Sequence, residues 1–125
     1  MKNCSNDLTE KVIGCAIEVH RTLGPGLLEN TYEQCLAHEL SMQAVPFKLQ
    51  VPIPIKYKNI KLECGYRLDF LVDDCLILEL KSVEKLSKLH EAQILTYLKL
   101  TKIGTGLLIN FNASKLVNGI KRYKL

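Results

Sequence analysis

Two carboxylates and an ammonium group lie close together in a part of the sequence that is otherwise apolar. Asp69 belongs to one apolar run, and Glu79 and Lys81 end the next run, which follows a turn at Asp73-Asp74. Charges beside a hydrophobic sheet cost free energy unless they pair or bind an ion. Two carboxylates with one lysine leave a net negative charge, which suits Mg²⁺ or Mn²⁺. The spacing therefore predicts a divalent-metal site.

The two apolar runs are expected to be neighbouring strands, whose side chains alternate between the faces of a sheet. Glu79 and Lys81 then share a face with Ile77. The alternative to a metal site is a structural ion pair, in which Lys81 or Arg67 neutralises the acids. Carboxylates are rarely buried without a partner, and three charges in this arrangement favour metal binding. The other face of the second strand is expected to pack into the core and carries Leu76, Leu78 and Leu80.

Length and composition indicate one small domain, residues 1–125, with a core of its own. The chain has five cysteines, an odd number, and they are widely spaced and include no C-x-x-C pair. This pattern favours reduced thiols and a cytoplasmic location. No apolar run approaches the ~20 residues of a membrane span, so no membrane partner is expected. A net charge of +4 permits a polyanionic partner without requiring one.

Hydrophobic periodicity places these strands among helices. Apolar residues at helical spacing follow a capping-box-like Asp7 and Glu10, and Gly24-Pro25-Gly26 ends that helix. Val51, Ile53 and Ile55 alternate with prolines, which indicates a strand at a sheet edge. The expected order is two helices, a three-stranded meander, a helix and one or two strands, an α/β or α+β sandwich with a mixed sheet. The pattern predicts helices at about 7–23, 28–42 and 83–101, and strands from 47 to a turn at 58–59 and at 60–72, 75–81, 107–111 and 116–123.

Three motifs in this order resemble those of a known family. Gly26–Tyr32 fits the G-x-x-E-x-x-Y pattern of the GxxExxY family, a group assigned to the PD-(D/E)XK nuclease superfamily. Asp69 followed by Glu79-Leu80-Lys81 resembles the split motif of that superfamily, and Gln93–Tyr97 resembles its Q-x-x-x-Y element. The resemblance extends from about Val12 to Arg122.

The resemblance implies a restriction-endonuclease-like αβββαβ core with a mixed sheet flanked by helices. It also implies that Asp69 and Glu79 bind Mg²⁺ or Mn²⁺ for phosphodiester hydrolysis, together with the backbone carbonyl of Leu80 and waters. Lys81 would orient the attacking water or neutralise charge on the phosphate oxygens. Glu29 would be a further ligand or would position water, although from sequence alone an exposed glutamate stabilised by the helix dipole is the simpler interpretation.

Gln93 and Tyr97 are four residues apart, so they share a helix face and reach the same place over the sheet. With the motif they are expected to orient Lys81 or hold a substrate phosphate, while a surface glutamine beside a half-buried tyrosine is the ordinary alternative. Tyr32 is expected either to pack or to contact phosphate. Interleaved aromatic and basic residues of the kind that stack single-stranded bases are not recognised in the sequence.

These expectations combine into a metal-dependent nuclease whose partner is nucleic acid, with DNA favoured. A first alternative is a non-catalytic nucleic-acid-binding or regulatory module that keeps the fold. A second is a protein-interaction module in which the carboxylates are incidental. The sequence leaves the oligomeric state open.

Overall fold

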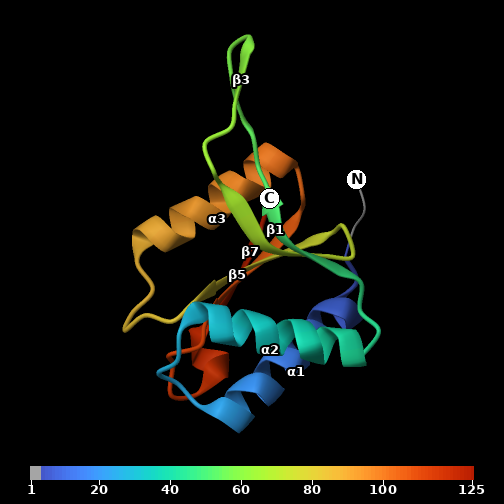
Figure 1. The fold of residues 1–125 in the computed structure, drawn as a ribbon, viewed down its shortest axis with the longest axis vertical. Coiled ribbons are helices and arrows are strands. Elements are labelled where there is room, and N and C mark those ends of the chain that lie inside the picture. The colour runs from blue at the N-terminus through green and yellow to red at the C-terminus, as the bar shows by residue number, and fades with distance from the viewer. Residues whose placement is uncertain (1–3) are drawn as a thin grey trace.

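The chain folds into a mixed β-sheet with helices on both faces, and a narrow hairpin projects from one end (Figure 1). The computed structural model describes residues 4–125. No helix in this range combines the length and the apolar character needed to cross a membrane. The elements are α1 (Asn6–Leu23), α2 (Glu29–Met42), β1 (Phe47–Pro52), β2 (Ile55–Tyr57), β3 (Ile60–Leu62), β4 (Arg67–Val72), β5 (Leu76–Lys81), α3 (Lys88–Thr101), β6 (Thr105–Asn110), the 3-10 helix η1 (Leu116–Gly119) and β7 (Ile120–Lys124).

The five-stranded sheet has the order β1-β4-β5-β6-β7. Strands β5 and β6 are parallel because α3 crosses over between them, and the other neighbours are antiparallel. The expected mixed sheet and αβββαβ core are therefore confirmed. The proline-containing strand β1 lies at one edge, as its missing N–H donors predicted, and β7 lies at the other.

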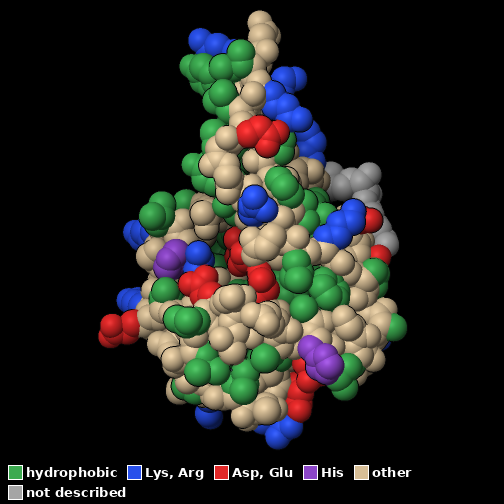
Figure 2. Space-filling model, in the orientation of Figure 1, with side chains coloured by type: hydrophobic (Ala, Val, Ile, Leu, Met, Phe, Trp, Pro, Cys, Tyr) green, Lys and Arg blue, Asp and Glu red, His purple; other side chains and the backbone are tan. Residues whose placement is uncertain are grey.

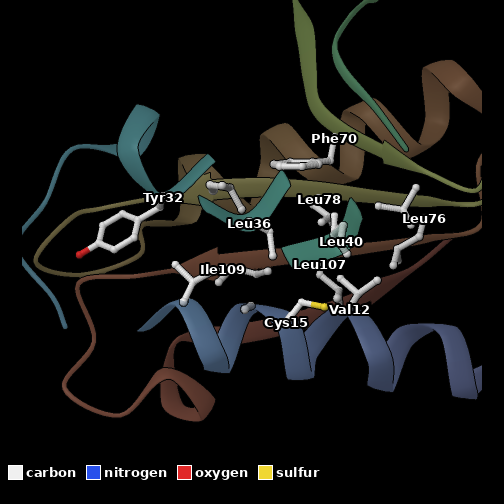
Figure 3. Close-up of a cluster of buried hydrophobic side chains, with 14 of the residues drawn as sticks. Val12, Cys15, Tyr32, Leu36, Leu40, Phe70, Leu76, Leu78, Leu107 and Ile109 are labelled. Atoms are coloured by element: carbon white, nitrogen blue, oxygen red, sulfur yellow. The ribbon is translucent and has the colours of Figure 1, made fainter. Parts of the chain in front are cut away.

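The larger part of the core fills the space between the sheet and the pair α1–α2 (Figure 3). The leucine face of β5 packs here, as alternation along the strand predicted. A smaller cluster lies on the opposite face under α3 and includes Ile77 and Tyr97. The side chains that pack on the α1–α2 side include Val12, Cys15, Tyr32, Leu36, Leu40, Phe70, Leu76, Leu78, Leu107 and Ile109.

The strand predicted from Ile60 to Val72 is interrupted. Its first part, β3, pairs only with β2 and forms a separate two-stranded sheet, which we call the β2–β3 arm. Gly65 has a φ of 80°, a conformation that favours glycine, and the chain leaves the arm there before β4 begins. A hydrogen bond of 2.8 Å from the Ile53 N–H to the Tyr66 carbonyl closes the base of the arm.

Two helix starts differ from prediction, each because a serine provides the cap. Ser5, not Asp7, caps α1 by accepting the N–H of Leu8. Helix α3 begins at Lys88, five residues later than the periodicity indicated, because Ser87 and His90 form a reciprocal capping box.

The expectation of five reduced thiols is wrong for one pair, since Cys4 and Cys75 form a disulfide. The bond joins the segment before α1 to the start of β5, across 71 residues of sequence. Disulfides are rare in a reducing cytosol, so the cysteines no longer argue for a cytoplasmic location. The free thiols among the described residues belong to Cys15, Cys35 and Cys64.

We predict that replacing Cys4 with Ser lowers the free energy of unfolding by about 2–4 kcal/mol, because the cross-link restricts a long loop of the unfolded chain. Cys64→Ser is the matched control, since Cys64 is exposed and unbonded. Urea unfolding under oxidising conditions measures both variants. Equal midpoints for Cys4→Ser and the wild type would contradict the cross-link.

Candidate active site

Strands β4 and β5 stop pairing where the two acids lie. The backbone ladder runs from Val72↔Leu76 to Phe70↔Leu78 and ends there. Beyond it, the Asp69 N–H donates to Glu79 Oε2 at 2.9 Å, and the Leu80 N–H donates to Asp69 Oδ2 at 2.8 Å. Side-chain oxygens thus replace the carbonyls that would have continued the ladder, and each acid is fixed by the backbone of the other strand.

Each carboxylate keeps one oxygen free of protein donors. Within residues 4–125, no hydrogen bond reaches Asp69 Oδ1 or Glu79 Oε1, and no ion pair joins either acid to Lys81 or Arg67. No described side-chain oxygen or nitrogen is fully buried without a partner, so the free oxygens are not sealed from solvent. The structural ion pair considered from the sequence is absent from the described residues.

Burial and repulsion by nearby acids disfavour ionisation of both Asp69 and Glu79. Glu79 is only 4% exposed, and burial together with the neighbouring Asp69 raises its pKa to about 8. Burial also raises the pKa of Asp69, and the charges of Glu33 and Glu29 add to the rise. Lys81 favours the ionised forms of both acids too weakly to reverse either shift. The site therefore gathers acidic groups that no ion pair within residues 4–125 compensates, and it favours a proton on Glu79 over a second negative charge.

An acidic cavity of about 310 Å³ opens beside Asp69. Figure 2 shows acidic side chains gathered at the centre of this face of the molecule. Gln50 of β1 lies next to Asp69, on the edge of β4 that faces away from β5. It has a φ of 52° and is not paired in the β1–β4 ladder. Its amide donates to Glu33 Oε1 at 2.5 Å, which links β1 to α2. The cavity is lined by Glu29, Asn30, Glu33, Gln50, Asp69 and Leu80.

The G-x-x-E-x-x-Y segment places Glu29 at this cavity. The Tyr32 hydroxyl donates to the Gly24 carbonyl at 2.6 Å and accepts the Leu27 N–H at 3.1 Å. Its ring is fully buried and stacks on Phe111 at 4.5 Å, so Tyr32 packs and does not contact phosphate. Tyr32 therefore fixes the turn from which α2, with Glu29 as its first residue, begins.

Two further contacts hold the loops around the site. Ser82, which follows Lys81, donates its hydroxyl to the Leu27 carbonyl at 2.5 Å and so ties the end of β5 to the start of α2. The buried side chain of Asn110 accepts the Val83 N–H and donates to the Val83 carbonyl. These contacts fix the direction in which the chain leaves β5.

Lys81, Gln93 and Tyr97 line a different cavity from Asp69. This groove of about 670 Å³ lies between α3 and the base of the β2–β3 arm. Burial and the charges of Glu79 and Asp69 raise the pKa of Tyr97 to about 12, so its hydroxyl stays protonated and can donate a hydrogen bond. The six residues singled out in the sequence therefore lie in two places. Glu29 and Asp69 line the acidic cavity, and Glu79 accepts the Asp69 N–H beside it. Lys81, Gln93 and Tyr97 line the groove.

Sequence reasoning left out Asn30, Glu33 and Gln50 of the cavity lining, and Asn110 beside the site. Glu33 is four positions after Glu29 and so shares its helix face, a signal that could have found it. Asn110 is a polar residue at the end of an apolar strand, which is a weaker signal. Gln50 carries no local signal, because only the pairing of β1 with β4 brings it beside Asp69.

The raised pKa of Glu79 predicts how the metal-free protein responds to pH. The folded state favours the protonated form of Glu79. The stabilisation that this proton provides is therefore complete below the ordinary pKa of 4.5 and is lost as the pH rises to about 8. Relative to Glu79→Gln, the free energy of unfolding of the wild type should fall across this range. Urea unfolding with chelator at several pH values measures the difference. Parallel curves for the two proteins would contradict the shift.

Asp69 offers a second test that separates charge from hydrogen bonding. Asp69→Asn keeps an oxygen that can accept the Leu80 N–H and removes a repelled charge, so metal-free stability should be unchanged or higher. Asp69→Ala leaves that N–H without a partner and should cost about 1–3 kcal/mol. Thermal unfolding with chelator compares the two. Destabilisation of Asp69→Asn as large as that of Asp69→Ala would mean that the charge itself holds the fold together.

Comparison with known families identifies the fold. The sequence profile of the PD-(D/E)XK nuclease superfamily matches residues 6–123. No curated protein and no solved structure gives a significant match. The match covers nearly the whole chain, and the mixed sheet flanked by helices is consistent with a restriction-endonuclease-like fold. The chain therefore belongs to the PD-(D/E)XK nuclease superfamily.

Proposed function

We propose that this chain, as one domain of the GxxExxY type, hydrolyses phosphodiester bonds in nucleic acid, with DNA as the favoured substrate. The observation that carries the proposal is the interruption of the β4–β5 ladder by Asp69 and Glu79. Glu79 is buried and Asp69 half-buried there, each has one oxygen left for a ligand, and no ion pair from a described residue neutralises them. A fold that needed these acids only for structure would be expected to pair them.

The donors fit a hard divalent cation. Asp69, Glu79, Glu29 and the backbone carbonyl of Leu80 would hold Mg²⁺ or Mn²⁺, since all four offer oxygen atoms. When bound, the ion supplies polarisation of the scissile phosphate and a lower pKa for an attacking water. Burial and repulsion hold a proton on Glu79 in the metal-free protein, and ligand binding would have to release it.

Lys81, Gln93 and Tyr97 act on the substrate from the groove side. Lys81 is partly exposed and, within residues 4–125, forms no ion pair, so its ammonium group is available to neutralise charge on phosphate oxygens. Tyr97 keeps its proton and would donate a hydrogen bond to the substrate, which excludes it as a general base at neutral pH. Gln93 is one helical turn from Tyr97 on the same face of α3, and it orients Lys81 or the substrate phosphate.

One observation favours the non-catalytic alternative. In the part of the chain that the structure describes, no three His, Cys, Asp or Glu side chains are already arranged as a metal-binding cluster. A module that binds nucleic acid without cutting it would keep the fold and the groove with this arrangement. Metal binding and hydrolysis separate the two functions.

We predict hydrolysis that requires Mg²⁺ or Mn²⁺, stops with chelator, and falls at least about 100-fold in Asp69→Asn and Glu79→Gln, because each change removes a ligand charge. Added metal should also raise the melting temperature of the wild type by mass action and that of the variants much less. Asp74→Asn is the control, since Asp74 is an exposed acid beside Lys48. The measurements are cleavage of labelled single- and double-stranded DNA and RNA, and thermal unfolding with added metal.

Full activity in both site variants would refute the assignment of Asp69 and Glu79. Nucleic-acid binding without cleavage, and without stabilisation by either metal, would support the non-catalytic module instead.

A further inference from the structure

The β2–β3 arm has one apolar side and one basic side. Directly paired residues of an antiparallel hairpin share a face, so Tyr57 and its partner Ile60 lie on the same side as Ile55 and Leu62. Tyr57 is 56% exposed and Ile60 is 53% exposed, so this side is not covered by the core. Figure 2 shows hydrophobic side chains on one side of the projecting arm and Lys or Arg side chains along the other. An isolated two-stranded hairpin is only marginally stable, so a partner that covers the apolar side would stabilise this arm.

Like charges face each other on the opposite side of the arm. Lys56 pairs directly with Lys61, an arrangement that destabilises a hairpin unless an anion neutralises it. Lys58 at the tip lies over the Tyr57 ring, 5.4 Å from its centre. Among the described residues, none of these three lysines has an ion-pair partner. The basic side therefore favours a negatively charged ligand.

The apolar side of the arm continues into the groove beside the candidate active site. Ile55 lines that groove together with Tyr66 and Lys81, and Tyr66 contacts Tyr97 edge to face at 6.4 Å between ring centres. Tyr66 is 44% exposed, so part of its ring remains free. The lining residues include no Asp or Glu. A surface with exposed aromatic rings thus extends from the apolar side of the arm to Lys81, two residues after Glu79, while Lys56 and Lys61 lie on the opposite side of the narrow arm.

We propose that the β2–β3 arm and the groove at its base bind a nucleic-acid strand with unpaired bases, so that the substrate is single-stranded. Bases lie against Tyr57 and Tyr66, because any base can stack on an aromatic ring, and the phosphates lie toward the lysines of the arm. In a duplex the bases already stack on one another and their faces are not available to these rings. The inference rests on the proposed nuclease function for its link to cleavage, but the binding itself does not require metal.

The fold brings together aromatic and basic residues that were not recognised as an interleaved pattern in the sequence. Lys56-Tyr57-Lys58 is a short run, and its relation to Lys61 and Tyr66 depends on the hairpin pairing and on the return of the chain to β4. These aromatic and basic residues are therefore neighbours in the folded protein but are only partly adjacent in the sequence.

Binding is tested with a fluorescent single-stranded DNA of mixed sequence and the same sequence as a duplex, by anisotropy in chelator so that no cleavage occurs. The wild type should bind the single strand at least about tenfold more tightly than the duplex. Tyr57→Ala and Tyr66→Ala should each weaken single-strand binding by about tenfold or more, the loss expected for one base stack. Tyr57→Phe keeps the ring and should bind as the wild type does.

The lysines are tested through the salt dependence of binding. Lys56→Gln combined with Lys61→Gln should make the slope of log affinity against log salt shallower by about 1.4, if each lysine neutralises one phosphate of a single strand. Lys11→Gln is the matched control, because Lys11 is an exposed lysine of α1 on the other side of the sheet. Circular dichroism confirms that each variant is folded.

The outcomes distinguish this inference from the proposed function. Equal or tighter duplex binding, or Tyr57→Ala binding as well as Tyr57→Phe, overturns the single-strand surface even if the protein cuts DNA. Single-strand binding that depends on Tyr57 supports the surface even if no cleavage is found. A dimer that covers the arm, dissociates in Ile60→Ala and leaves DNA affinity unchanged would overturn it in favour of a second copy of the chain.

Discussion

The site depends on two hydrogen bonds, in which Glu79 accepts the Asp69 N–H and Asp69 accepts the Leu80 N–H. In an uninterrupted antiparallel pair the backbone would satisfy itself, and the side chains would be free to rotate. Here each carboxylate takes the place of a carbonyl on the neighbouring strand, so neither acid can move without leaving a buried N–H unpaired. The sheet thereby holds two acids together, and the leucine face of β5 anchors them to the core.

Several residues around this pair hold the neighbouring loops in position. Tyr32 holds the turn before α2, and Ser82 ties the end of β5 to that turn. His20 bonds to the carbonyl of Ala113 at 2.7 Å and joins α1 to the loop after β6. In the G-x-x-E-x-x-Y segment, Tyr32 therefore holds the turn, and Glu29 lines the cavity together with Asp69.

Local signals made most of the fold predictable and left specific gaps. Apolar periodicity identified the helices, and Asp69 and Glu79 were found because charged residues in apolar strands are conspicuous. Gln50 could not be found, since its place opposite Asp69 depends on a pairing between distant segments and on a left-handed backbone. The Cys4–Cys75 bond was missed for the same reason: residues 71 positions apart meet only once the sheet has formed.

The position of Lys81 shows how the fold keeps opposite charges apart over a short distance. Lys81 shares a face of β5 with Glu79, yet no described ion pair joins them, and its side chain lines the groove. A direct ion pair would have cancelled the negative charge of the cavity and the positive charge of the groove together. Under the proposed function, this separation would let the cavity attract a cation while the groove attracts a phosphate backbone. A metal ion and a polyanion can then be held side by side, and each reduces the cost of binding the other.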